Sequence, residues 1–271
     1  MSRGASLSRA LAAYPAMLRA GLAGALAYRA EMLVWMLTTT MPLVSLALWS
    51  AVAREGPVGP FSQRDFAVYF IAVLLVRQLS SSWLVWELNA EIKNGALAQK
   101  LLRPVHPLWY YSAENLGALP LRILLCAPLV ILSVVVFDAL PLPRTLAGAL
   151  AFALSLIGAW LINFFMMALV GALAFFVESS VAIFEVYTLG FMVLSGYLVP
   201  LDLFSPRIRA IADALPFRYV IAFPVQIATG ALTGTALLQP LAIQWAYVTG
   251  AALAAVLVFR AGVRRFGAFG G

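Results

Sequence analysis

The sequence is poor in the residues from which metal and catalytic centres are built. Its 271 residues include one cysteine, Cys126, and one histidine, His106. A single cysteine excludes an internal disulfide framework, and a lone histidine offers no cluster of metal ligands. No nucleophile stands in a recognisable pattern with a base. We therefore predict no metal site and no catalytic residue, and we do not expect the chain to be an enzyme by itself.

Charged residues are also scarce. They make up 11% of the chain, whereas 63% of it is hydrophobic; globular proteins have about 25% charged and 45–50% apolar residues. This composition predicts an all-α, polytopic membrane protein. The net charge of +7 could suggest nucleic-acid binding. Arginines in loops and tails are better explained by membrane topology and anionic lipid head groups, so membrane lipids are expected partners and nucleic acid is not.

Long apolar runs predict six transmembrane helices in one transmembrane domain covering residues 1–271. A hydrocarbon core about 30 Å thick needs roughly 20 apolar residues per helix. The predicted spans are residues 32–52, 66–88, 116–137, a helix within 145–177, 181–199 and 237–259. Spans one to five thus fall within 31–199, and the sixth span and tail within 236–271. Residues 1–30 place leucines on one arc of a helix and predict an interfacial helix.

The distribution of arginines predicts the sidedness of the chain. Four arginines precede the first span and three follow the last. Because cytoplasmic segments are enriched in Lys and Arg, both termini are expected in the cytoplasm. Residues 56–60 and 200–217 are then expected on the outer side.

A basic segment, residues 91–104, lies between the second and third spans. Gly95 frees the backbone to turn, and Pro104 stops the following helix. Leu97 and Leu101, four residues apart, are predicted to share an apolar face that fills a groove on a soluble partner. A helix resting in lipid head groups is the alternative. The residues predicted to form this contact are Lys93, Asn94, Gly95, Leu97, Lys100, Leu101, Arg103 and Pro104.

The segment 200–235 is too interrupted by proline for a span and too apolar for a free loop. Irregular backbone at membrane depth is tolerated where it packs in protein or lines a cavity. We expect a pair of short re-entrant helices that dip in from the outer face. The residues that define this segment are Gly196, Pro200, Pro206, Pro216 and Phe217.

Arg77 is predicted to face protein or a water-filled cavity. Counted from Phe66 at about 1.5 Å per residue, it lies roughly 16 Å deep, where an unpaired arginine is costly. Ser81 follows one turn later, and Glu185 is the expected acidic partner. The pair could contact substrate, form a gate or hold helices together. Asn163 in the fourth span is a further candidate for the substrate contact or gate formed by Arg77, Ser81 and Glu185. An interhelical hydrogen bond is the simpler interpretation of Asn163.

Two stretches resemble the membrane subunits of ABC exporters of the second type. Ile92-Lys-Asn-Gly95 followed by Leu-Leu-Arg-Pro104 resembles the coupling helix of that family. Ser195-Gly-Tyr-Leu-Val-Pro-Leu-Asp-Leu-Phe-Ser-Pro206 with Ala214-Leu-Pro-Phe217 is similar to the series leading into its re-entrant helices. Tyr28-Arg-Ala30 and Val76-Arg-Gln78 resemble a bacterial branch of unassigned substrate.

The resemblance implies a permease subunit of an ATP-driven exporter in the bacterial inner membrane. Its implied partners are a cytoplasmic ABC ATPase dimer, which carries ATP and Mg, and a second permease in a hetero- rather than a homodimer. The chain has no G-x-x-x-x-G-K-[ST] loop, so it is expected to bind no cofactor itself. An apolar lining would suit a lipid-like or amphipathic substrate.

An ion-coupled secondary transporter is the alternative function. It would use acidic residues inside the membrane and paired, interrupted half-helices. Glu185 and Glu87 are the candidates, but the sequence shows no internal duplication.

Overall fold

The computed structural model describes residues 3–30, 34, 40–137, 141–178 and 180–266, and all regular elements in these ranges are helical. The all-α prediction is confirmed. The α-helices are α1 (Arg3–Ala27), α3 (Met41–Val52), α4 (Gln63–Ser80), α5 (Leu84–Lys93), α6 (Leu97–Leu101), α7 (Pro107–Gly117), α8 (Leu119–Phe137), α9 (Leu146–Ala172), α10 (Ser180–Leu194), α11 (Pro206–Asp213), α12 (Ala222–Ala228) and α13 (Leu238–Phe266).

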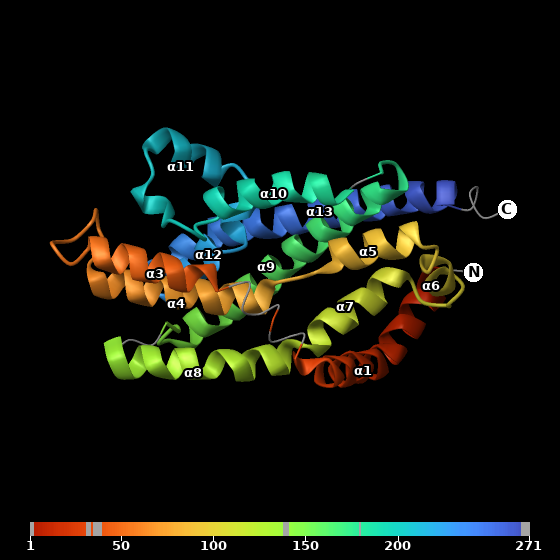
Figure 1. Cartoon of the computed structure of the whole chain (residues 1–271), viewed down its shortest axis with the longest axis horizontal. Coiled ribbons are helices and arrows are strands. Elements are labelled where there is room, and N and C mark those ends of the chain that lie inside the picture. Colours follow the sequence, from red (N-terminus) through yellow and green to blue (C-terminus); the bar gives the residue numbers. More distant parts are fainter. Residues whose placement is uncertain (1–2, 31–33, 35–39, 138–140, 179, 267–271) are drawn as a thin grey trace.

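Most helices run along the long axis of the molecule (Figure 1). At one end lie α6, the first turns of α1 and the last turns of α13, and we call this the α6 end. At the other end lie α11 and the turn between α3 and α4, and we call this the α11 end.

The core is built around α9, which packs against α13, α5, α12 and α4. Gln244 of α13 is fully buried and ties three segments together. Its Nε2 donates to the backbone oxygens of Ser155, at 2.9 Å, and Tyr219, at 2.8 Å. Gly158 makes room for it, since a Cβ there would lie 2.8 Å from Gln244 Cδ. Small residues and polar side chains join helices in this way inside membranes.

Four helical segments are long and apolar enough to cross a membrane, or five with one bent pair. They are Ser8–Ala27, Gln63–Lys93, Leu146–Phe175 and Gly234–Phe266. The second, fourth and sixth predicted spans coincide with the last three. The six-span layout stays a prediction, because α3 and α10 have only 12 and 15 residues and the predicted first span includes residues outside the described ranges. The interfacial helix also remains untested, since Ser8–Ala27 itself has the length of a span.

The second predicted span is not one continuous helix. α4 ends at Ser80 and α5 begins at Leu84, with non-helical backbone at Ser81, Ser82 and Trp83. Three consecutive serines, residues 80–82, stand at this break, and the side chains that hold it come from other helices.

The predicted pair of short helices is present, with a different placement. The segments Pro206–Asp213 and Pro216–Ala228 are bent by 72° relative to each other. α12 is buried in the bundle, whereas most of α11 is exposed at the α11 end. Only the second helix therefore enters the protein, because α11 carries exposed charges such as Arg207.

Candidate functional site

A tight turn starts the short helix at the α6 end. Asn94 Oδ1 accepts a hydrogen bond from the Ala96 amide at 3.0 Å, and Gly95 has φ 78°, a conformation that glycine adopts without strain. α6 follows over one turn, and the chain leaves it through Arg103 and Pro104, which are exposed. The predicted short helix is thus formed between Gly95 and Pro104.

Lys100 fixes α6 to its neighbours rather than pointing toward a partner. Its Nζ lies 2.8 Å from Glu91 Oε1 and 3.0 Å from Glu87 Oε1, both on α5. It also lies 3.9 Å from the ring centre of Tyr111, whose hydroxyl donates to Glu91 Oε2 at 2.6 Å. Burial alone would lower the pKa of Lys100, but the carboxylates outweigh it and raise this pKa. Lys100, predicted to contact a partner, is therefore engaged within the permease instead.

The predicted apolar face of Leu97 and Leu101 is wrong. Leu97 is 0% exposed and packs in the core with Leu88 and Leu108, and Leu101 is half-buried. Helix periodicity alone could not tell which side faces the protein. The exposed apolar side chain beside α6 is that of Leu102, the residue that follows the helix, which is 88% exposed. The surface available to a partner, which we call the α6 surface, comprises Lys93, Asn94, Gly95, Leu102, Arg103 and Pro104.

The break between α4 and α5 is held by polar groups from two other helices. Arg122 of α8 donates through Nη1 to Ser81 O and Ser81 Oγ, both at 3.1 Å. Asn163 of α9 donates through Nδ2 to Ser80 O at 2.8 Å. These donors satisfy carbonyls left free where a helix ends. The positive charge of Arg122 also suits the negative end of the α4 dipole.

Arg122 was not among the residues predicted from the sequence. It is 1% exposed, and its guanidinium carbon lies 4.7 Å from the ring centre of Trp83. The sequence does contain a signal for Arg122, because an arginine within the apolar run 116–137 marks a functional or structural site in a membrane helix.

Arg77 lies one turn before the break and points into the bundle. Its guanidinium carbon is 5.2 Å from the ring centre of Phe191, and it forms a hydrogen bond with Tyr197. Its Nη1 is buried without a hydrogen-bond partner. Arg77, Ser81 and Asn163 are thus brought to one region, as the sequence suggested.

Glu185 does not join that region. It is exposed on α10, between Val186 and Phe184, and forms no ion pair with Arg77 among the described side chains. α10 turns Phe184 and Phe191 toward the bundle, which places Glu185 on the outward face. The predicted Arg77–Glu185 pair is therefore wrong.

The residues predicted around the re-entrant segment form turns at the α11 end. Gly196 has φ 85°, and its carbonyl accepts a hydrogen bond from Tyr69 at 2.8 Å. The Phe217 ring centre lies 5.3 Å from that of Tyr187. Three prolines mark starts of short helices: Pro200 precedes Leu201–Leu203, Pro206 opens α11 and Pro216 opens Pro216–Tyr219.

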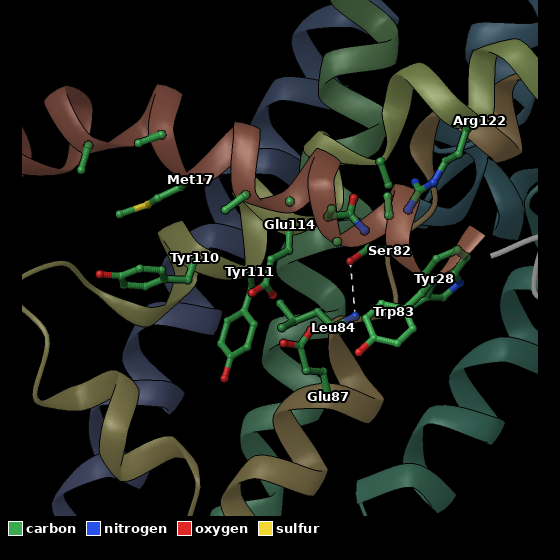
Figure 2. Close-up of a pocket in the computed structure, with 18 of the residues that line it drawn as sticks. Met17, Tyr28, Ser82, Trp83, Leu84, Glu87, Tyr110, Tyr111, Glu114 and Arg122 are labelled. Atoms are coloured by element: carbon green, nitrogen blue, oxygen red, sulfur yellow. Dashed lines mark hydrogen bonds between the residues drawn. The ribbon is translucent and has the colours of Figure 1, made fainter. Parts of the chain in front are cut away.

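A cavity of about 870 Å³ lies between α1, α5 and α7. Figure 2 shows Glu87 and Glu114 in its middle, with Trp83 and Arg122 toward one end and Tyr110 toward the other. Glu114 lies on α7, which precedes the predicted third span. Burial, and next the Glu87 carboxylate, raise the pKa of Glu114 to about 7. In the described part of the chain no three His, Cys, Asp or Glu side chains form a group that could hold a metal.

Comparison with known families gives one match over most of the chain. The family model described as ABC-2 family transporter protein covers residues 35–270. Curated proteins and solved structures gave no match. The matched region contains the broken span, α6, and the bent pair at the α11 end. By this match the chain belongs to the ABC-2 family of transporter proteins.

Proposed function

We propose that this multi-pass permease of an ABC transporter is driven by a cytoplasmic ATPase that docks on the α6 surface. The family implies association with an ATPase component, and the permease itself is a transport component, not a catalytic enzyme. The observation that carries the proposal is the attachment of α6 to α5 through Lys100, Glu87 and Glu91. Because these ion pairs join the two helices, a displacement of α6 by the ATPase would also displace α5.

The broken span offers a route for that motion. α5 packs on α9 and leads directly into the break at Ser81–Trp83. Gly171 of α9 lets Leu88 approach so closely that a Cβ at this glycine would lie 3.1 Å from Leu88 Cδ2. Because packed helices move as rigid units, tilting of α5 would alter the arrangement of Arg122 and Asn163 at the break.

The outward face of α10 supports a second permease as partner. Val186 and Leu189 are 71% and 66% exposed on this face, and Glu185 lies among them. A carboxylate facing hydrocarbon costs about 2.5–3.5 kcal/mol at the centre of a span. Cover by another protein removes this cost, and a heterodimer would supply a complementary side chain that a copy of the same face lacks.

On the basis of the sequence, we also propose export of a lipid-like or amphipathic substrate across a bacterial inner membrane, with both termini cytoplasmic. ATP and Mg would be bound by the partner ATPase, and the α6 surface would then face the cytoplasm. The ion-coupled alternative gains no support, because Glu87 is paired with Lys100 and Glu185 points outward.

The test is Leu102→Asp, with Ile211→Asp at the α11 end as the matched control, since both leucine and isoleucine are exposed. We expect Leu102→Asp to reduce co-purification of the ATPase at least about tenfold, because it removes an exposed apolar anchor, while the permease stays folded. Ile211→Asp should retain the ATPase. Full retention of both ATPase and transport in Leu102→Asp would refute docking at the α6 surface.

A further inference from the structure

One wall of the cavity between α1, α5 and α7 is made almost entirely of small side chains. α1 contributes Ala13, Ala16, Ala20, Gly21, Gly24 and Ala25. Gly21 packs against α7, since a Cβ there would lie 2.7 Å from Ala113 O. Gly24 differs, because an added Cβ would meet nothing within 4 Å. The space beside Gly24 is therefore open and apolar, and it is not used for helix packing.

The opposite wall carries charges of both signs. At one end is Arg122, 1% exposed, with its Nε buried and without a hydrogen-bond partner. In the middle are Glu87 and Glu114. Among the described residues Arg122 forms no ion pair with either carboxylate. The cavity thus presents Arg122 and an acidic pair that do not neutralise each other, and Arg103 lines it as a second cation.

The carboxylates in and beside the cavity also outnumber the cations that pair with them. In the part of the chain that the structure describes, Lys100 is the cation that pairs with Glu87 and Glu91. Glu114 lines the same cavity, and burial, followed by the Glu87 carboxylate, raises the pKa of Glu114 to about 7. An added ammonium group would relieve both the repulsion between these carboxylates and the loss of water around them.

The positions of Arg122 and of the acidic side chains along the cavity indicate the kind of ligand that it can hold. The Arg122 guanidinium lies 4.7 Å from the Trp83 ring centre, and Glu87 follows Trp83 by four residues on α5, a rise of about 6 Å. A ligand that reaches both must carry an anion and a cation joined by a short spacer, with an apolar part for the α1 wall. Arginine binds phosphate oxygens through several of its donors at once.

We propose that this cavity binds a zwitterionic phospholipid of the phosphatidylethanolamine class. Its phosphate lies on Arg122, its ammonium lies between Glu87 and Glu114, and an acyl chain follows the α1 wall past Gly24. The amine points toward the α6 end and the chain toward the middle of the bundle, as in a lipid of the leaflet on that side. This site is separate from the α10 face and shares Arg103 with the α6 surface, and lipid binding in it does not depend on the proposed coupling to an ATPase.

The experiment fills the cavity without disturbing the fold. Gly24→Leu places a side chain in the open space and improves helix propensity, whereas Ala23→Leu adds the same bulk at an exposed position of α1 that does not line the cavity. The purified, delipidated proteins are incubated with phosphatidylethanolamine, with phosphatidylglycerol or with a cationic diacyl lipid. Retained lipid is counted by native mass spectrometry.

We expect the unmodified protein and Ala23→Leu to retain phosphatidylethanolamine at least about tenfold better than either other lipid, since each lost charge-assisted contact costs about that factor. Gly24→Leu should lose this excess. Glu114→Gln should weaken the preference over phosphatidylglycerol, and Arg122→Gln the preference over the cationic lipid. Undiminished retention in Gly24→Leu, or equal retention of all three lipids by the unmodified protein, would overturn the proposal.

Discussion

At the scale of single residues, both the backbone conformation and the close packing at position 196 require a glycine, Gly196. Its φ is 85°, and a Cβ would lie 2.6 Å from the Tyr69 hydroxyl and 3.0 Å from Ala222 Cβ. Gly196→Ala should therefore lower the unfolding free energy by about 2–3 kcal/mol, from left-handed strain of about 1–2 kcal/mol plus the displaced Tyr69 bond of about 1 kcal/mol. Thermal unfolding in detergent measures the loss.

Gly230 provides the control for that substitution. It has φ 76°, but an added Cβ would meet nothing within 4 Å, so Gly230→Ala should show the backbone strain alone. Equal losses in the two variants would mean that the contact with Tyr69 contributes nothing.

Also at the residue scale, Glu114 predicts a dependence of stability on pH. Its pKa is about 7 in the folded protein, against an ordinary 4.5. Between these values the unfolded state binds fewer protons, so the unfolding free energy falls as pH rises. Glu114→Gln removes this loss, and its stability relative to the unmodified protein should improve from pH 5 to pH 8. Melting temperatures in lipid-free detergent check this; an offset that is the same at both pH values contradicts it.

At the scale of elements, the break in the second span depends on donors from α8 and α9. Asn163 is 1% exposed and satisfies Ser80 O. Asn163→Leu keeps the number of side-chain heavy atoms and the branching but leaves this carbonyl unpaired, which should cost about 1–3 kcal/mol. Thr188→Val is the control, because Thr188 Oγ1 bonds Phe184 O of its own helix. Chemical unfolding should separate the two variants by at least about 1 kcal/mol; no separation would show that water or lipid replaces Asn163.

At the scale of the whole molecule, the two ends should lie on opposite sides of the membrane. Cys126 is buried and is the one native cysteine, so Cys126→Ser gives a background without reactive thiols. Glu55 at the α11 end and Lys93 at the α6 end are both exposed. A membrane-impermeant maleimide should label Glu55→Cys in intact cells, and Lys93→Cys only after permeabilisation, as the arginine bias predicts. The reverse pattern would invert the topology.

Much of the fold could be predicted from the sequence, because long apolar runs, prolines and glycines act locally. They placed α9, α13, the short α6 and the proline-marked turns near Pro200, Pro206 and Pro216. The candidate site was predicted less well. Leu97 and Glu185 were assigned to the wrong faces, and Arg122 was missed, since the side of a uniformly apolar helix that faces protein is not encoded in its own periodicity.

The sequence by itself determined the class of the protein, since a chain with 63% hydrophobic and 11% charged residues must satisfy its backbone within helices in a membrane. It also determined where several helices start and stop. Only the tertiary structure decided that Ser81–Trp83 would leave the helix, that Lys100 would bind Glu91, and that α1 would leave a cavity open beside Gly24. The reason is physical: each of these features depends on side chains from distant segments, which supply the hydrogen bonds, the counter-charges and the space that no local stretch contains.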